Sequence, residues 1–183
     1  MKSGVNTKML NKKIGVNLFL NIFAVILVGV FLRGYLRENY RLNVTSSLPV
    51  GIYKIDKIDE VKKGDKLTFK IPNDVKQYML DRNYINKSVI SFLKRVGALE
   101  GDIVEVGNNL VINGEIIKPI LKKDTLGIDL PVQYGKYKLK SGEFFMLGDT
   151  LNSFDSCYIG IVKEEQLEKK AKLILEIGGG KER

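Results

Sequence analysis

Hydrophobic residues fall into one long uncharged run near the start of the chain and many short runs after it. The long run, Ile14–Leu32, contains 19 residues and no charge. As a helix it would measure about 28 Å at 1.5 Å per residue, close to the hydrocarbon thickness of a bilayer. A buried core helix is the alternative, but this length and the basic residues on both sides favour a membrane span.

The residues that follow the run argue against a signal peptide that is removed. The run is long for the apolar core of a signal peptide, and Arg33-Gly34-Tyr35-Leu36-Arg37 follows it instead of a small-residue cleavage site. We therefore expect an uncleaved anchor. Four lysines and no acidic residue in 1–13 favour a cytoplasmic N-terminus. Arginines on the far side of the run reduce the difference in basic residues between the two sides.

After the anchor, short runs of β-type residues alternate with turn signals. The pair Asn113-Gly114, between Leu-Val-Ile and Glu-Ile-Ile, is the strongest hairpin signal in the chain. We expect strands or hairpins at Gly51–Lys57, Lys66–Ile71, Ser88–Val96, Ile103–Val106, Asn109–Ile117, Glu143–Leu147 and Leu173–Ile177. The pattern predicts a mainly β fold, an antiparallel β domain of about 140 residues on a single N-terminal transmembrane helix.

Two short helices and one irregular stretch complete the expected elements. Asp74 is expected to cap a helix that runs to about Arg82, with Gln77 three residues on as in a capping box. Lys163–Lys170 is a second short helical candidate, and 118–136 is expected to be an excursion between strands.

The same pattern divides the chain into segments. We expect a basic cytoplasmic N-terminus at 1–13, a transmembrane anchor at 14–32 and a juxtamembrane linker at 33–43. An extracytoplasmic domain at 44–177 and a flexible tail at 178–183 follow.

Charge is concentrated around the anchor. Of the net charge of +9, residues 1–13 carry +4, residues 33–41 carry +2 and the rest of the chain only +3. The excess would therefore meet lipid headgroups. A basic face interleaved with aromatic residues is not visible in the remainder, so we expect no nucleic-acid partner.

Composition limits the chemistry more sharply than charge does. The chain has no histidine and one cysteine, Cys157. A Ser-His-Asp triad, a Cys-His dyad, a histidine metal site and an internal disulfide are thereby excluded. We expect no metal and no cofactor. If the protein is an enzyme, its base must be a carboxylate, a lysine or a tyrosine.

A serine-containing stretch, Thr45–Tyr53, directly follows the linker. Pro49 restricts the residue before it to an extended backbone, and Gly51 permits a sharp change of direction. A short rigid bend of this kind can present Ser46 or Ser47 as a nucleophile. An ordinary loop after a membrane anchor would have a similar sequence.

Lys94 is the lysine whose sequence context differs most from a surface position. In the expected strand, the period of two places Phe92, Lys94 and Val96 on one face. A lysine buried there would lose its proton more easily and could activate a serine. The alternatives are a solvated face, or a side chain that runs along apolar neighbours to reach water.

Gly148–Gly160 is a polar stretch between two glycines. It is typical of a tight loop with side-chain-to-backbone turns, and a purely structural capped loop would look the same. Ser153 and Asp155 are two positions apart, so in an extended segment their side chains point to the same side and can support a nearby amine. Cys157 is expected to be a small buried filler.

Taken in order, these features resemble the type I signal peptidases, which are membrane-bound Ser-Lys proteases. The elements are the anchor, Thr-x-Ser-x-Pro-x-Gly-x-Tyr at 45–53, Lys-Arg-Val at 94–96 with Gly-Asp at 101–102, and Gly-Asp…Ser-x-Asp-Ser…Gly at 148–160. The form of the first box is most similar to the conjugative-transfer branch, the TraF-type pilin peptidases. The resemblance extends from the anchor to about Gly160, with 47 positions from Ser47 to Lys94.

The resemblance implies a role for each matching residue. Ser47 is the nucleophile, Lys94 the general base, Thr45 an oxyanion-hole hydroxyl beside the Ser47 N–H, Ser153 the residue that orients the lysine, and Asp155 a supporting carboxylate. Ser46 stays open as the nucleophile, because the mainstream signal-peptidase box places its serine three residues before the proline.

The chain also departs from the family pattern. Cys157 stands where an arginine usually follows Asp-Ser, so an Asp155–Arg salt bridge is not available there, and a nearby residue such as Arg95 is a candidate to replace it. Glu100 replaces a frequent proline, and Thr150 replaces a frequent asparagine.

The leading hypothesis is a membrane-bound serine endopeptidase that removes signal or leader segments from exported preproteins, such as a pilin-like subunit of a conjugation system. The expected partners are preprotein or propilin substrates, the lipid bilayer and conjugation or secretion machinery. A non-catalytic anchored β module that scaffolds such machinery is the alternative. A self-cleaving repressor with a Ser-Lys dyad is a third reading, but it needs an N-terminal DNA-binding domain where the apolar run lies.

Overall fold

The N-terminal helix contains the apolar run. The structure, a computed structural model, describes residues 7–177, with side chains from Asn17 onward, so the expected tail at 178–183 lies outside the described residues. Helix α1 (Thr7–Asn39) has 33 residues and continues through most of the expected linker before β1 (Tyr40–Asn43) begins. Among the described residues, Asn17–Asn39 is long and apolar enough to cross a membrane, by length and composition, and none of its most apolar stretch is buried. Helix α1 is therefore a candidate membrane span.

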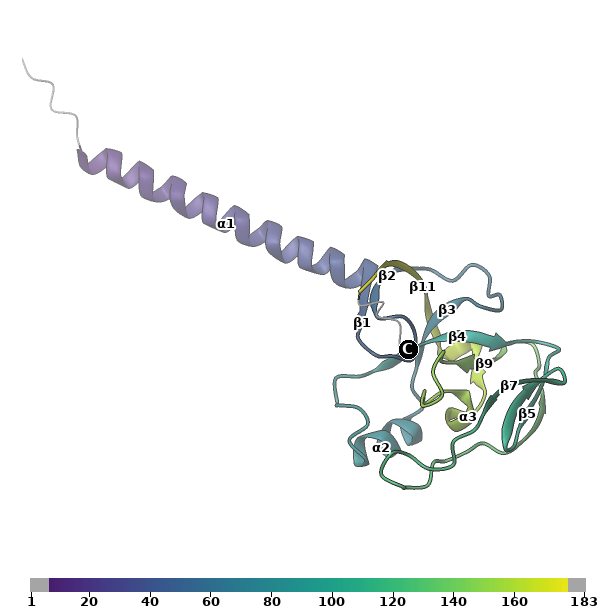
Figure 1. Ribbon diagram of the computed structural model, residues 1–183. Coiled ribbons are helices and arrows are strands. Elements are labelled where there is room, and N and C mark those ends of the chain that lie inside the picture. The colour runs from purple at the N-terminus through teal and green to yellow at the C-terminus, as the bar shows by residue number, and fades with distance from the viewer. Residues whose placement is uncertain (1–6, 178–183) are drawn as a thin grey trace, which may run out of the picture. The chain divides into compact units, whose positions relative to one another are not determined.

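The part of the chain from Arg41 onward forms an antiparallel β unit of its own (Figure 1). A seven-stranded sheet has the order β1-β2-β11-β3-β4-β9-β10, and a four-stranded sheet has the order β7-β6-β5-β8. The remaining strands are β2 (Gly51–Asp56), β3 (Lys66–Lys70), β4 (Ser91–Ala98), β5 (Ile103–Val106), β6 (Asn109–Ile112), β7 (Glu115–Pro119), β8 (Gly135–Lys138), β9 (Glu143–Leu147), β10 (Val162–Lys163) and β11 (Leu167–Glu176). The predicted antiparallel, mainly β fold is confirmed.

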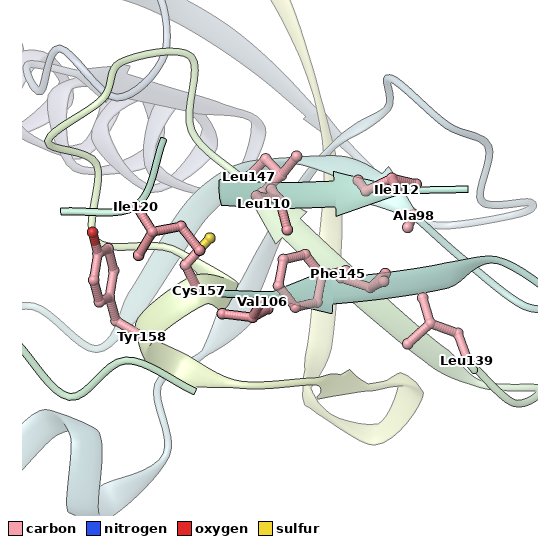
Figure 2. Close-up of a cluster of buried hydrophobic side chains, with 11 residues drawn as sticks. Ala98, Val106, Leu110, Ile112, Ile120, Leu139, Phe145, Leu147, Cys157 and Tyr158 are labelled. Atoms are coloured by element: carbon pink, nitrogen blue, oxygen red, sulfur yellow. The ribbon is translucent and has the colours of Figure 1, made fainter. Parts of the chain in front are cut away.

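Strand β9 contributes to both hydrophobic clusters. Phe145 and Leu147 belong to one cluster, drawn in Figure 2, whereas Phe144 and Met146 belong to the other. This division follows from the period of two, since successive side chains of a strand point to opposite faces. Strand β9 therefore carries one cluster on each face and is a firm base for the loop that follows it.

The turn chemistry in the sequence predicted the hairpin of the small sheet correctly. Asn113 and Gly114 have φ angles of 52° and 86°, the left-handed pair that a type I′ hairpin needs, and they connect β6 to β7. The excursion at 118–136 is largely irregular, with an isolated bridge between Lys123 and Asp129. Strand β8 at its end carries no clear signal and was not predicted.

Three local predictions were wrong in whole or in part. The segment Lys163–Lys170 is not an α-helix. It holds the end of β10, one 3₁₀ turn at Glu164–Gln166, and the start of β11. Strand β11 pairs with both β2 and β3, and these long-range hydrogen bonds outweigh the helix-favouring composition of the segment.

Helix α2 (Asn73–Asp81) exists, but Asp74 does not cap it. The N-cap is Pro72, without a side-chain cap hydrogen bond, and the side chain of Gln77 donates to Asp81 instead of completing a capping box. Strand β4 begins three residues later than predicted. The side chain of Asn86 accepts both from the N–H and from the hydroxyl of Ser88, which makes a turn before the strand.

The short helix α3 (Ser156–Ile159) follows the polar loop after β9. Asp155 is its N-cap, with a side chain that accepts from the N–H of Cys157. All four helical residues are buried. The loop between β9 and α3 is thus fixed at both ends by packed structure.

Candidate active site

The serine loop is shaped by Asn43, a residue that sequence reasoning missed. Its side-chain amide donates to the carbonyl oxygens of Thr45, Leu48 and Pro49 at 3.0 to 3.1 Å. Its side-chain oxygen accepts from the N–H and the hydroxyl of Thr45. An asparagine just before a run of hydroxyl residues and a proline is a signal for such a turn, and it could have been recognised.

A buried leucine and a buried tyrosine hold the end of this loop in place. Leu48 is buried, and the buried side chain of Tyr53 in β2 donates its hydroxyl hydrogen to the Pro49 carbonyl at 2.8 Å. The carbonyl of Ser47 accepts from the N–H of Asp149 at 2.7 Å, which connects the serine loop to the loop after β9. Ser47 is half-buried, whereas Ser46 is exposed.

Thr45 and Ser47 are neighbours in space. Their hydroxyl oxygens lie 3.2 Å apart. Thr45 has one hydroxyl hydrogen, and the Asn43 side-chain oxygen lies 2.8 Å away to accept it. With that hydrogen committed, Ser47 is the donor in the contact between the two hydroxyls.

Lys94 is buried, as the period of two in β4 predicted. Only 5% of the residue is exposed, and Val96 on the same face is fully buried. Burial lowers the pKa of Lys94 from 10.5 to about 8, because the charged form is poorly solvated there. The neighbouring Lys118 also lowers this pKa, whereas Asp155 and Asp149 act in the opposite direction.

Ser153 is the hydrogen-bond partner of this lysine. The Nζ atom of Lys94 donates to the hydroxyl oxygen of Ser153 at 2.7 Å. This position of Ser153 requires a glycine at 148, because a Cβ there would lie 1.9 Å from the Ser153 Oγ. The same Cβ would lie 3.0 Å from the Ser47 carbonyl oxygen. Gly148 therefore allows the serine loop and Ser153 to meet beside Lys94.

We expect Gly148→Ala to lower any activity of this site by about 100-fold. The new methyl group must displace Ser153, and a displacement of about 1 Å can have an effect of this size. Gly107→Ala is the matched control, since a Cβ at Gly107 meets nothing closer than 4.0 Å. Turnover and thermal unfolding of both variants would test this, and equal turnover in the two would contradict it.

Asp155 lies behind the site in a fully buried position and has a partner that sequence reasoning missed. Its carboxylate accepts from the Nζ of Lys118 in β7 at 2.5 Å. Arg95, named above as a candidate for this role, pairs with Asp149 instead, at 2.9 Å. Lys118 is 37 residues before Asp155 in another sheet, so no local pattern pointed to it.

Cys157 is buried as expected and belongs to the cluster in Figure 2. Burial raises the pKa of its thiol, so the group stays protonated and unreactive near neutral pH. The described residues contain no group of three or more acidic, histidine or cysteine side chains that could hold a metal ion.

Four of the five predicted site residues line one groove. This groove has a volume of about 1610 Å³ and is bordered by Thr45, Ser47, Lys94 and Ser153, together with the loops around Tyr84–Ile90 and Leu121–Leu130. Its volume exceeds the range of ordinary small-molecule pockets, which fits an extended peptide better. Ser46 also borders the groove, so lining alone does not separate the two serines.

Comparison with known proteins identifies the family of this chain. Residues 15–176 match the family model described as signal peptidase, peptidase S26. The chain belongs to this signal peptidase family, and the resemblance seen in the sequence is confirmed.

Individual relatives come from two groups. The plasmid transfer protein TraF of Escherichia coli is 32% identical over 140 residues, which cover 70% of this chain and 78% of that protein. The signal peptidase I T of Bacillus subtilis (strain 168) is 27% identical over 170 residues, covering 84% of this chain and 81% of that protein. A crystal structure of a signal peptidase I from Enterococcus faecalis V583 matches with a TM-score of 0.37 and 22% identity, over 62% of this chain and 98% of that one.

Proposed function

We propose that this protein is a membrane-bound serine endopeptidase with a Ser-Lys dyad that removes leader segments from exported preproteins. The observation that carries the proposal is the buried Lys94, hydrogen-bonded to Ser153 at the wall of the groove that Ser47 also borders. A lysine whose pKa is lowered to about 8 is partly neutral near pH 7 to 8, which is the state that a general base needs.

In the proposed reaction, the neutral amine of Lys94 takes the hydroxyl proton of Ser47 while the serine oxygen attacks the scissile carbonyl carbon. The tetrahedral intermediate collapses, and the Lys94 ammonium gives its proton to the leaving amine. A water molecule then attacks the ester on Ser47 while Lys94 takes its proton. The second tetrahedral intermediate collapses with cleavage of the bond to the serine oxygen, which releases the carboxyl end of the leader, and the Lys94 ammonium returns the proton to that oxygen. Ser47 and the neutral lysine are thereby restored.

The oxyanion would be stabilised by the Ser47 N–H and the Thr45 hydroxyl. In the structure that hydroxyl lies within hydrogen-bond distance of Asn43, so it must rotate toward the substrate to donate. We propose that Ser153 holds the Lys94 amine and that Asp155 supports the loop that carries Ser153.

The proposed setting is a cell membrane, with the N-terminus cytoplasmic and the domain at 44–177 on the outer side. The lysines before the anchor support this orientation. The relatives named for plasmid or conjugal transfer support a pilin-like subunit of a conjugation system as the substrate, with conjugation machinery as partner.

The test is cleavage of candidate preproteins co-expressed with the protein in membranes. We expect a shortened product with the wild type and none with Ser47→Ala, because the covalent step needs the serine oxygen. The new N-terminus of the product should be the same at every expression level. Equal cleavage with both proteins would assign the activity to a host peptidase, and no cleavage by the wild type would favour the scaffolding alternative.

A further inference from the structure

Asp155 is a buried carboxylate that takes part in three interactions. Besides Lys118, it accepts from the N–H of Gly148 at 3.2 Å and from the N–H of Cys157 at 3.1 Å. The Gly148 N–H lies at the start of the loop that carries Ser153, and the Cys157 N–H lies in α3, just after that loop. The carboxylate therefore fixes the backbone that places Ser153 against Lys94.

The pair that Asp155 makes with Lys118 is shielded from water. The Asp155 side chain is fully buried, and only 11% of the Lys118 side chain is exposed. In such surroundings the loss of one partner leaves an uncompensated charge, which is costly and acts on every charge nearby. Lys94 is a buried amine whose pKa both Asp155 and Lys118 influence.

Lys94 is influenced by charges from two directions. Asp155 and Asp149, from the loop after β9, favour its protonated form, and Lys118, from β7, favours its neutral form. Asp149 is itself paired with Arg95 at 2.9 Å. Lys118 is thus the cation that opposes Asp155 at the lysine.

We propose that Lys118 is a positioning residue for catalysis, which neutralises Asp155 so that the carboxylate holds the Ser153 loop without holding a proton on Lys94. The inference rests on the proposed function in that Lys94 is the general base. It assigns to β7, a strand of the second sheet, a role in a site built by the first sheet.

The experiment compares the pH dependence of kcat/KM in Lys118→Met and wild-type protein, both full-length in detergent. Without the Lys118 charge, Asp155 favours the Lys94 ammonium. The acid limb of the kcat/KM profile, where activity rises as Lys94 loses its proton, should therefore move up by about one pH unit. Turnover near pH 7 should then fall roughly tenfold and should recover near pH 10. A purely structural role would lower turnover equally at all pH values.

Three further variants separate charge from packing. Lys118→Arg should restore the wild-type limb, and the double variant Lys118→Met with Asp155→Asn should move it back down, since it removes both charges together. Lys136→Met is the matched control, because Lys136 forms an exposed ion pair with Glu105 in the same small sheet. An unchanged acid limb in Lys118→Met, or a limb that moves as far in Lys136→Met, would overturn the proposal.

A second readout does not depend on cleavage. In Ser47→Ala protein with isotopically labelled lysine, the ε-carbon shift of Lys94 reports its titration directly. Its pKa should rise by about one unit when Lys118→Met is added. If the wild type cleaves nothing but this shift is seen, the proposed function fails and only the effect of the Lys118 charge on Lys94 is confirmed. If cleavage is seen without the shift, the inference alone fails.

Discussion

Ser47→Ala is expected to lower kcat for leader removal by at least about 10⁴-fold, with little effect on thermal unfolding. The large loss follows because no other group can form the acyl intermediate, and a remaining binding site cannot replace a missing nucleophile. Stability should change little, because the Ser47 hydroxyl makes one contact, with Thr45 at the surface. The measurement is single-turnover cleavage of a leader peptide by purified protein in detergent.

Ser46→Ala is the matched control for this prediction. Ser46 is exposed, whereas Ser47 is half-buried, accepts from the Asp149 N–H at its carbonyl and contacts the Thr45 hydroxyl. We therefore expect nearly wild-type turnover from Ser46→Ala. If this variant were inactive and Ser47→Ala active, the nucleophile would lie one position earlier and Thr45 would lose its proposed oxyanion role.

The part of the site that could be predicted from sequence is the part that depends on local backbone geometry. The burial of Lys94 follows from the period of two in a strand, and the hairpin follows from Asn113-Gly114, the pair that tolerates left-handed φ angles. Gly148 could be recognised as a loop residue, but its contact with Ser153 depends on how two segments meet.

The part that could not be predicted depends on pairing between distant segments. Lys118 reaches Asp155 from another sheet, and its sequence context, Glu-Ile-Ile-Lys-Pro, does not indicate a buried partner. The segment Lys163–Lys170 contains good helix formers, yet strands β2 and β3 both hydrogen-bond to β11 and determine its conformation. In each case the deciding partner is far away in the chain, where periodicity and propensity carry no signal.

Lys94→Met is expected to abolish cleavage and, at pH 7, to make the protein more stable. The pKa of Lys94 falls from 10.5 in an unfolded chain to about 8 in the fold, so the unfolded state binds more protons between these values. The free energy of unfolding therefore rises with pH through this window, and below pH 8 the buried ammonium opposes folding. This burial destabilises the wild type by about 3 kcal/mol at pH 7, and the variant is relieved of it. The variant also loses the hydrogen bond from Lys94 to Ser153, which reduces its gain by about 1 kcal/mol.

The net gain of roughly 2 kcal/mol corresponds to an increase in Tm of about 4–8 °C for a domain of this size. Thermal unfolding at pH 7 and pH 10 measures it, and the gain should shrink at pH 10, where Lys94 is neutral in the fold. Lys140→Met is the matched control, since Lys140 is an exposed lysine and its replacement should alter neither Tm nor its pH dependence. A lower Tm for Lys94→Met at pH 7 would mean that the amine stabilises the fold, and the burial that makes Lys94 a base would then be contradicted as well.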